Sequence, residues 1–260
     1  MILNIENLSF AYRDKVVFKN LSFKLQDKTI CSILGPNGIG KTTFIKCLLG
    51  LNPRYTGDIY IDDKNVKNID RKTFYSFVAY LKQGGKETSI YTVLDTVLLG
   101  LASEINPLLK PSKADIEKVD NILKELNIYH LRDKYVSRLS GGEAQMVYMA
   151  RALVKEPEIL ILDEPESNLD YRNQLLMLDT MMKLKNKGKL IVFNTHYPEH
   201  ALRFSDKTLI MSDNFSFKFG DTKDIITKEN IENTYKIKVA VGELSDSDNI
   251  YKDIIPLSII

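Results

Sequence analysis

The sequence has little cysteine, little net charge and no long hydrophobic run. Its two cysteines, Cys31 and Cys47, lie in apolar stretches without the spacing of metal ligands. Both are expected to be small buried side chains rather than parts of a disulfide or metal framework. The formal net charge of +2 gives no strong field for attracting nucleic acid or an anionic membrane surface. No nucleic-acid partner is therefore expected.

No window of the sequence is apolar over the length needed to cross a bilayer. The most hydrophobic candidate, residues 93–102, is too short and is interrupted by Asp95. Residues 1–10 alternate apolar and polar side chains, which is typical of a strand rather than of a signal peptide. If the protein works at a membrane, we expect another chain to span it.

Hydrophobic patterning predicts an α/β protein with an inserted helical region. The 260 residues suffice for one large domain, or for one domain with a substantial insert. Helical spacing dominates residues 92–152, where Ser112 and Asp115 form a predicted capping box. A further helix is predicted at 171–187, closed by Gly188. Strands are predicted at Ile2–Phe10, Leu21–Leu25, Thr29–Leu34, Gly57–Ile61, Phe77–Leu81, Ile159–Leu162, Leu190–Phe193 and Thr208–Met211.

A glycine-rich loop follows the predicted strand Thr29–Leu34 and precedes a predicted helix. It fits the phosphate-loop pattern at every fixed position, and the glycines let backbone N–H groups turn toward phosphate oxygens. Lys41 is expected to reach the β- and γ-phosphates of ATP, and the Thr42 hydroxyl to bind Mg²⁺. The predicted nucleotide-binding residues here are Gly35, Pro36, Asn37, Gly38, Gly40, Lys41, Thr42 and Thr43.

Two adjacent carboxylates end the apolar strand Ile159–Leu162. Acidic side chains at the end of a buried strand are costly unless a cation or another partner compensates them. Asp163 is placed to hold Mg²⁺, directly or through water. Glu164 is placed to act as general base on the attacking water. Between the glycine-rich loop and the two carboxylates, the segment Leu139–Glu143 directly precedes a predicted amphipathic helix. Taken alone, this segment is only a common kind of helix start.

These motifs, in this order, resemble the ATP-binding cassette (ABC) family over nearly the whole chain. Residues 35–43 resemble its Walker A loop, 139–143 its signature motif and 159–164 its Walker B strand. The resemblance implies a P-loop NTPase core of the RecA-like type with an N-terminal antiparallel β-subdomain. In one ABC ATPase domain spanning 1–260, the expected parts are an α/β core at 1–86 and 155–215, a helical subdomain at 87–154 and a C-terminal extension at 216–260.

The resemblance also implies roles for four residues outside the three motifs. Gln83 matches the glutamine that contacts Mg²⁺ and senses the γ-phosphate, although it could be an ordinary loop amide. His196 matches the switch histidine, the alternative being a buried core histidine. Asp170 closes the D-loop or simply caps the next helix, and these roles can coexist. Tyr12 lies where the adenine-stacking aromatic is expected, unless Phe10 serves or Tyr12 only packs.

In the family's mechanism two cassettes pair head to tail around two ATP molecules, and a homodimer is expected here. Ser140, Gly141 and Gly142 would face the ATP on the partner's phosphate loop. Two positions depart from the family pattern: Glu143 replaces a common Gln, and Glu166 replaces a common Thr or Ser. Activity is expected to survive both. The expected catalytic residues are Lys41, Gln83, Glu164 and His196.

Softer similarities favour the importers of iron-siderophore, haem and cobalamin, although zinc and manganese importers share part of them. They lie at 91–100, 111–115, 195–201 and 227–235. We therefore expect an ATPase, peripheral on the cytoplasmic side of the plasma membrane, that drives metal-chelate uptake through a separate permease. Gly84–Gly100 would contact that permease, and an extracytoplasmic binding protein would participate indirectly.

The alternative is a soluble ABC ATPase that transports nothing. A chromosome-type member would need a long coiled coil between residues 43 and 139, and neither the length nor a heptad pattern allows it. A translation-type member usually carries two cassettes, whereas this chain carries one. A cofactor-assembly ATPase stays open. A scaffold without turnover is disfavoured because Lys41, Glu164 and His196 are all present.

Overall fold

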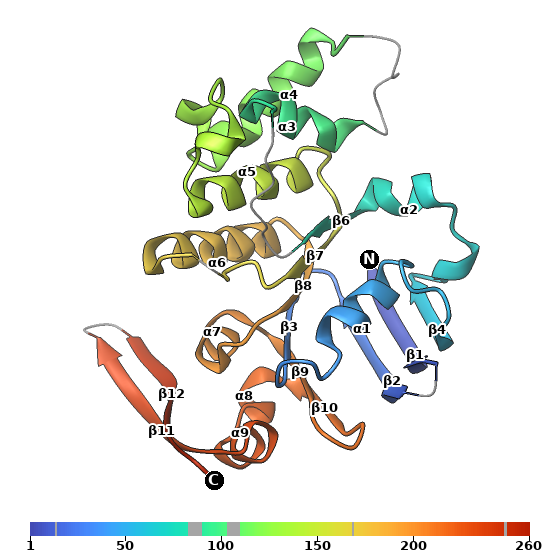
Figure 1. Cartoon of the computed structure of the whole chain (residues 1–260), viewed down its shortest axis with the longest axis vertical. Helices are drawn as coiled ribbons and strands as arrows, with labels where there is room; N and C mark the ends of the chain where they lie inside the picture. Colours follow the sequence, from blue (N-terminus) through green and yellow to red (C-terminus); the bar gives the residue numbers. More distant parts are fainter. Residues whose placement is uncertain (14, 83–89, 103–109, 168, 247–248) are drawn as a thin grey trace. The chain divides into compact units, whose positions relative to one another are not determined.

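The computed structural model divides the chain into two compact units. Unit 1 comprises Met1–Ile69 and Lys185–Ile260, and unit 2 comprises Asp70–Leu184. Figure 1 shows their helices and strands coloured along the chain. The structure describes residues 1–13, 15–82, 90–102, 110–167, 169–246 and 249–260.

Unit 1 begins with an antiparallel sheet whose strand order is β2-β1-β4-β5. These strands are β1 (Ile2–Tyr12), β2 (Lys15–Gln26), β4 (Thr56–Ile61) and β5 (Lys64–Asn65). Helix α1 (Lys41–Leu48) packs on this sheet, since the Phe44 ring lies 5.8 Å from that of Phe18 and 6.0 Å from that of Phe23. The expected N-terminal antiparallel subdomain is confirmed, with longer strands than the alternation predicted.

Unit 1 also contains mostly parallel strands in the order β10-β9-β3-β8. They are β3 (Ile30–Leu34), β8 (Leu190–Asn194), β9 (Lys207–Met211) and β10 (Phe217–Asp221). β3 runs parallel to β8 and β9, and every residue of β3 and β8 is buried. Such continuous apolar runs are typical of strands covered on both faces. Because parallel strands end at the same edge, the segments after β3 and β8 lie close together.

The end of the chain packs against this sheet. Its elements are α7 (Pro198–Phe204), α8 (Thr222–Ile225), α9 (Lys228–Tyr235), β11 (Ile237–Asp246) and β12 (Asn249–Ile259). β11 and β12 form an antiparallel hairpin, which the sequence pattern did not predict. One apolar cluster joins these elements to β3 and β9 and consists of Leu34, Ala201, Ile210, Ile226, Ile231, Val239 and Ile254.

Unit 2 combines a pair of parallel strands with a group of helices. β6 (Val78–Leu81) pairs with β7 (Ile159–Asp163), and the two lie side by side in Figure 1. The predicted capping box is confirmed: the Ser112 hydroxyl accepts from the Asp115 N–H, and the Asp115 side chain accepts from the Ser112 N–H. The helices are α2 (Arg71–Phe77), α3 (Val93–Leu98), α4 (Lys113–Glu125), α5 (Gly141–Leu153) and α6 (Tyr171–Asn186), the last two residues of α6 lying in unit 1.

The strand predicted at Phe77–Leu81 begins one residue later, at Val78, because helix α2 precedes it. Asp70 caps α2, its carboxylate accepting from the Thr73 N–H at 3.0 Å. Short 3₁₀ turns lie at Val66–Asn68, Leu99–Leu101, Tyr129–Leu131 and Val136–Arg138.

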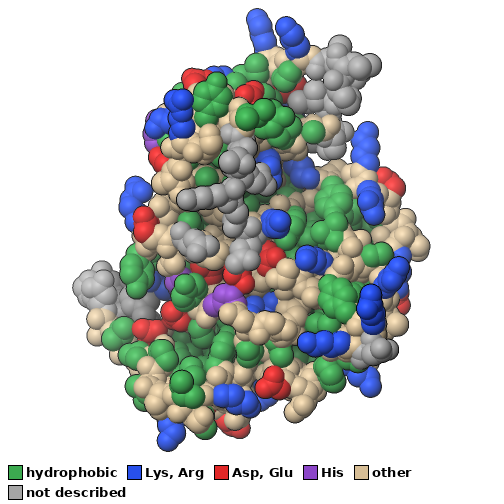
Figure 2. All heavy atoms as spheres, viewed as in Figure 1, with side chains coloured by type: hydrophobic (Ala, Val, Ile, Leu, Met, Phe, Trp, Pro, Cys, Tyr) green, Lys and Arg blue, Asp and Glu red, His purple; other side chains and the backbone are tan. Residues whose placement is uncertain are grey.

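The surface carries charges of both signs. On the face drawn in Figure 2, basic and acidic side chains are both spread among apolar and neutral ones. Within the part of the chain that the structure describes, no helix has the length and apolar character to span a bilayer.

Candidate active site

The glycine-rich loop leaves the end of β3 in a conformation that only glycine adopts easily. Gly35 has φ 150° and Gly40 has φ 117°. A Cβ on Gly35 would lie 2.4 Å from the Met211 carbonyl oxygen, and one on Gly40 would lie 2.4 Å from Cγ1 of Val17. Both positions therefore exclude larger residues by strain and by lack of space. Because these two glycines have no side chain, the loop can lie close to β9 and β2.

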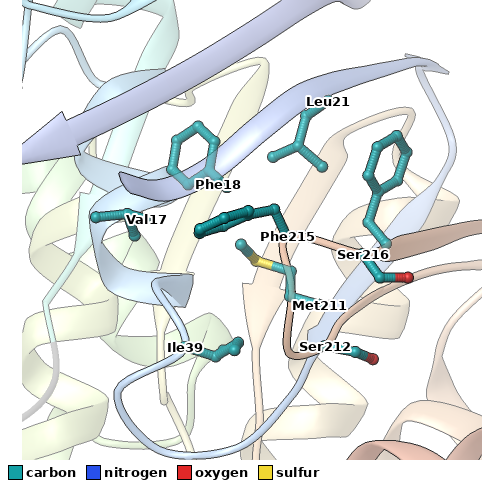
Figure 3. A pocket seen from close by; sticks show the side chains of 9 residues that line it. Val17, Phe18, Leu21, Ile39, Met211, Ser212, Phe215 and Ser216 are labelled. Carbon is teal, nitrogen blue, oxygen red and sulfur yellow. The ribbon is translucent and has the colours of Figure 1, made fainter. Parts of the chain in front are cut away.

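The side chain of Ile39 makes apolar contacts that hold the same loop in place. Its side chain lines a small pocket with Val17 of β2 and Met211 of β9, as Figure 3 shows. The pocket volume of about 10 Å³ leaves room for about one water molecule, so it serves as packing rather than as a ligand site. The loop is thus anchored by apolar contact through Ile39.

Lys41 is the first residue of α1, and its side chain turns back over the loop. It is 5% exposed. The ammonium Nζ donates to the carbonyl oxygens of Gly35, at 2.6 Å, and of Pro36, at 3.1 Å. A buried ammonium requires such partners. The arrangement puts a positive charge beside the amino end of α1, where an anion is stabilised by both.

His196 approaches this lysine from the neighbouring strand. It lies two residues beyond the end of β8, and the Lys41 Nζ is 3.5 Å from its Nδ1. Thr195 fixes the turn before it: its N–H donates to the Ile33 carbonyl at 3.1 Å, and its hydroxyl accepts from the Tyr197 N–H at 3.0 Å. The position of His196 therefore follows from the parallel pairing of β3 and β8.

Tyr12 ends β1 beside an open pocket of about 510 Å³. The residue is 49% exposed, its ring packs edge-on against that of Phe10 with the ring centroids 4.7 Å apart, and its hydroxyl accepts from Nδ2 of Asn52 at 3.0 Å. Phe10 itself is 6% exposed. Of the two aromatics considered for base stacking, Tyr12 is therefore the one with a ring face available to a planar ligand.

In unit 2, Asp163 is the last residue of β7 and is 3% exposed. Its Oδ2 accepts a hydrogen bond from the Tyr80 hydroxyl of β6 at 3.2 Å. Burial, and then the negative charge of Asp163, raise the pKa of Tyr80, so the phenol stays protonated and donates. Glu164 follows in a left-handed backbone conformation, φ 51°, which turns the chain away from the strand.

The signature segment is a capped helix start. The Ser140 hydroxyl accepts from the Glu143 N–H at 3.2 Å, and the Glu143 carboxylate accepts from the Ser140 N–H at 2.8 Å. This last hydrogen bond is the main cause that lowers the pKa of Glu143. Glu143, which replaces the common Gln, therefore supplies the second of the two hydrogen bonds of a capping box.

Asp170 and the signature both contact one residue, Asn173. The Asp170 carboxylate accepts from the Asn173 N–H at 2.8 Å, which is the helix-capping contact given above as the alternative to its D-loop role. The Asn173 side chain lies against Gly142, where an added Cβ would be 2.3 Å from its Nδ2. Gln145 of α5 donates to the Pro165 carbonyl at 3.2 Å. These contacts join the start of α5 to the segment after β7.

The structure groups the predicted residues by unit. Gly35, Lys41 and His196 are brought together in unit 1, where Tyr12 borders its own pocket. In unit 2, Asp163 follows the pairing of β6 and β7, while the signature and D-loop residues share contacts with Asn173. Gln83 lies outside the described residues, as do residues 84–89 of the expected permease contact.

The contacts of two residues in this region, Tyr80 and Asn173, were not predicted from the sequence. Tyr80 lies three residues before Gln83 in a strand whose apolar run gave no sign of a polar role. Asn173 lies in the first turn of α6, and its contact is with a glycine 31 positions earlier, counting from 142 to 173. Only pairing of strands or packing of helices could have revealed either residue.

The available ligands fit Mg²⁺ chemically. Thr42 in unit 1 offers a hydroxyl, and Asp163 in unit 2 offers a buried carboxylate oriented by Tyr80; each taken by itself is an oxygen donor of the kind that Mg²⁺ prefers. Among the described residues no three His, Cys, Asp or Glu side chains gather into a metal cage. Mg²⁺ sites in nucleotide-hydrolysing proteins usually combine one or two protein ligands with phosphate oxygens and water.

A strand, a glycine loop with its lysine and a following helix define a P-loop nucleotide-binding protein. Comparison with known proteins narrows the class: residues 18–167 match the ABC transporter family. The chain is 35% identical over 237 residues, 90% of its length and 93% of the other, to an ATP-binding protein assigned to iron chelatin transport in Helicobacter pylori (strain 26695). It is 32% identical over 257 residues, 98% of its length and 96% of the other, to the molybdate import ATP-binding protein MolC of Haemophilus influenzae.

A solved structure of a protein assigned to the metal-chelate type of ABC transporter, in an inward-facing conformation, is similar with a TM-score of 0.87. It is 31% identical, and the match covers 98% of this chain and 97% of that one. The protein therefore belongs to the ABC transporter family and is one of its ATP-binding, ATP-hydrolysing subunits.

Proposed function

We propose that this protein drives an importer of a metal chelate, such as an iron-siderophore, through a separate permease. The observation that carries the proposal is the extent of the likeness to the metal-chelate type transporter, which includes the C-terminal elements beyond the nucleotide motifs. The relative assigned to iron chelatin transport supports the same substrate class. Because another relative is a molybdate import protein, the proposed substrate class is metal-containing ligands in general rather than iron compounds alone.

In this proposal residues 1–260 form one ABC ATPase domain. Tyr12 stacks on the adenine, and the loop from Gly35 to Thr43 holds the phosphates with Lys41. Glu164 takes a proton from the attacking water, and His196 contacts the γ-phosphate region from beside Lys41. Thr42, Asp163 and Gln83 would hold Mg²⁺, which when bound neutralises charge on the β- and γ-phosphate oxygens. Apart from the proton transfer to Glu164, the proposed share of each residue is positioning or charge stabilisation.

The active form is proposed to be a homodimer. Ser140, Gly141 and Gly142 of one subunit would complete the site on the other, with the amino end of α5 directed at the γ-phosphate. ATP then stabilises the closed dimer, and hydrolysis releases it. The Asp170 carboxylate caps α6 at the Asn173 N–H, and the Asn173 side chain lies against Gly142, so the D-loop and the signature share one residue between them.

The permease is proposed to bind the region Gly84–Gly100 from the cytoplasmic side of the plasma membrane, where the protein is peripheral. Described residues of this region support the idea, because Ile90 is 80% exposed and Leu99 is 49% exposed. Contiguous exposed apolar patches are typical of protein contact sites, and the proposal is that these side chains contribute to one. An extracytoplasmic binding protein would act only through the permease.

The test is affinity purification of the tagged chain from detergent-solubilised membranes, followed by mass spectrometry. We expect a polytopic permease in stoichiometric amount. Leu99→Asp should lose the permease, whereas Leu51→Asp, whose leucine is also 49% exposed, should keep it. A purely soluble complex in the wild-type sample would contradict the importer proposal and favour the assembly-type ATPase.

A further inference from the structure

A hydrogen bond joins the C-terminal extension to the phosphate loop. The backbone N–H of Gly35 donates to the phenol oxygen of Tyr235 at 3.0 Å, across 200 positions of sequence. Tyr235 is the last residue of α9. Gly35 is buried and is the first residue of the loop after β3. This contact uses a residue that none of the nucleotide motifs contains.

Both backbone polar groups of Gly35 are held by side chains. Its N–H is bound by Tyr235, and its carbonyl oxygen is bound by the Lys41 ammonium at 2.6 Å. A buried N–H that leaves its strand needs another acceptor, since an unsatisfied one is costly. Burial is the main cause that raises the pKa of Tyr235 to about 12, so the phenol is neutral at working pH. Its oxygen therefore accepts as an uncharged, permanent partner.

Helix α9 is itself well fixed, so that Tyr235 can serve as a support. Thr227 caps the helix, its hydroxyl accepting from the Asn230 N–H at 3.2 Å. Ile231 is 1% exposed in the apolar cluster that also contains Leu34, the residue before Gly35. The Glu232 carboxylate accepts from the Val239 N–H at 3.0 Å, tying α9 to β11.

We propose that Tyr235 is a positioning residue for nucleotide binding, and that the C-terminal extension supports the phosphate loop. The proposal rests on the phosphate-binding role given above to the loop from Gly35 to Thr43. By fixing the first peptide N–H, Tyr235 keeps the loop in the conformation that binds phosphates, so less ordering is left for ATP to impose. The loop holds the phosphates before and during hydrolysis. Loss of Tyr235 should therefore weaken binding while leaving the chemical step nearly unchanged.

The test variant is Tyr235→Phe, which keeps the ring and removes the acceptor. In the purified chain with Mg²⁺-ATP or ADP, we expect Kd and KM to rise about three- to tenfold, the ratio that corresponds to one net hydrogen bond. The kcat at saturating ATP should stay within about twofold of the wild-type value. Amide hydrogen exchange at Gly35 should be slow in the wild type and at least about tenfold faster in the variant.

Thr227→Ala is the matched control, because it weakens the same helix by removing its cap without touching the loop. It should lower stability but leave Kd and the Gly35 exchange rate unchanged. Equal Kd values for Tyr235→Phe and wild type, equal losses in both variants, or fast Gly35 exchange in the wild type would each overturn the proposal. Lys41→Ala tests its foundation separately: wild-type nucleotide affinity in that variant would show that the loop itself had been misassigned.

Discussion

Tyr80→Phe tests whether the carboxylate at the end of β7 is oriented by its neighbour. The Tyr80 hydroxyl donates to Oδ2 of Asp163 at 3.2 Å, and Asp163 is 3% exposed. Removing the hydroxyl leaves a buried carboxylate with one donor fewer and with more rotational freedom. Phenylalanine keeps the ring, so the packing between β6 and β7 should be preserved.

The expected effect has two parts. Hydrogen bonds to charged groups are worth about 1.5–3 kcal/mol, and Tyr80 is only partly buried, so the free energy of unfolding should fall by about 1.5–2 kcal/mol. Partners that orient a metal ligand typically change metal affinity by 10- to 100-fold. With Asp163 as a proposed Mg²⁺ ligand, we expect the Mg²⁺ concentration needed for half-maximal nucleotide binding to rise about 10-fold. The raised pKa keeps the phenol protonated, so the effect should not vary between about pH 6 and about pH 9.

Nucleotide binding is measured by calorimetry across a Mg²⁺ titration, alongside urea unfolding and ATPase rates. Tyr75→Phe is the control: it removes a hydroxyl from the adjoining helix α2 and leaves the Tyr80–Asp163 hydrogen bond intact. A Mg²⁺ dependence identical in Tyr80→Phe and wild type would refute the orientation argument. Equal changes in both variants would refute it too, because the hydrogen bond to Asp163 would then have no special part.

Three further changes have defined outcomes. Glu164→Gln should lower the ATPase rate by about 10²- to 10⁴-fold with ATP affinity retained, and unchanged turnover would remove Glu164 as the base. Gly142→Ala should lower the unfolding free energy by about 1–3 kcal/mol because of the contact with Asn173, and adding Asn173→Ala should restore part of it, as urea unfolding would show. Glu143→Gln should cost less than about 0.5 kcal/mol at pH 7. Because the folded pKa of Glu143 is lowered, its stabilisation is present above its unfolded pKa and lost as pH falls through the folded value, so the difference should vanish in acid unfolding.

Local patterns predicted much of the fold. The buried run at β3, the glycine loop and α1 are consecutive in sequence, so periodicity and turn chemistry suffice to place them. The capping box at Ser112 is likewise a three-residue relation, and the structure contains it. Helix α2 was missed because its seven residues are too few to show a clear period. The C-terminal hairpin was missed because its apolar residues are interrupted by charges and by a register shift near Val239.

In the candidate site too, local sequence patterns predicted some residues and missed others. Lys41 and Glu164 could be given roles from their immediate neighbours in sequence. The family resemblance gave His196 its role, but its closeness to Lys41 follows from the parallel pairing of β3 and β8, which neither the resemblance as stated nor periodicity predicted. Neither sequence neighbours nor the family resemblance gave Tyr80 or Tyr235 a role, although Tyr235 ends one of the segments that carry the resemblance. Each is a single aromatic residue whose partner is 83 or 200 positions away.

The missed contacts share a physical origin that makes them hard to predict. Tyr80 orients a carboxylate, and Tyr235 satisfies a backbone N–H, and in each case the tyrosine hydroxyl is supplied by an element brought in by tertiary packing. A phenol carries most of its surface as apolar ring, so in sequence it looks like one more core residue. Its polar end acquires meaning only when a buried donor or acceptor lies within reach. Residues of this kind are where a sequence-derived site is incomplete, because buried polar groups must be paired somewhere and the partner need not be local.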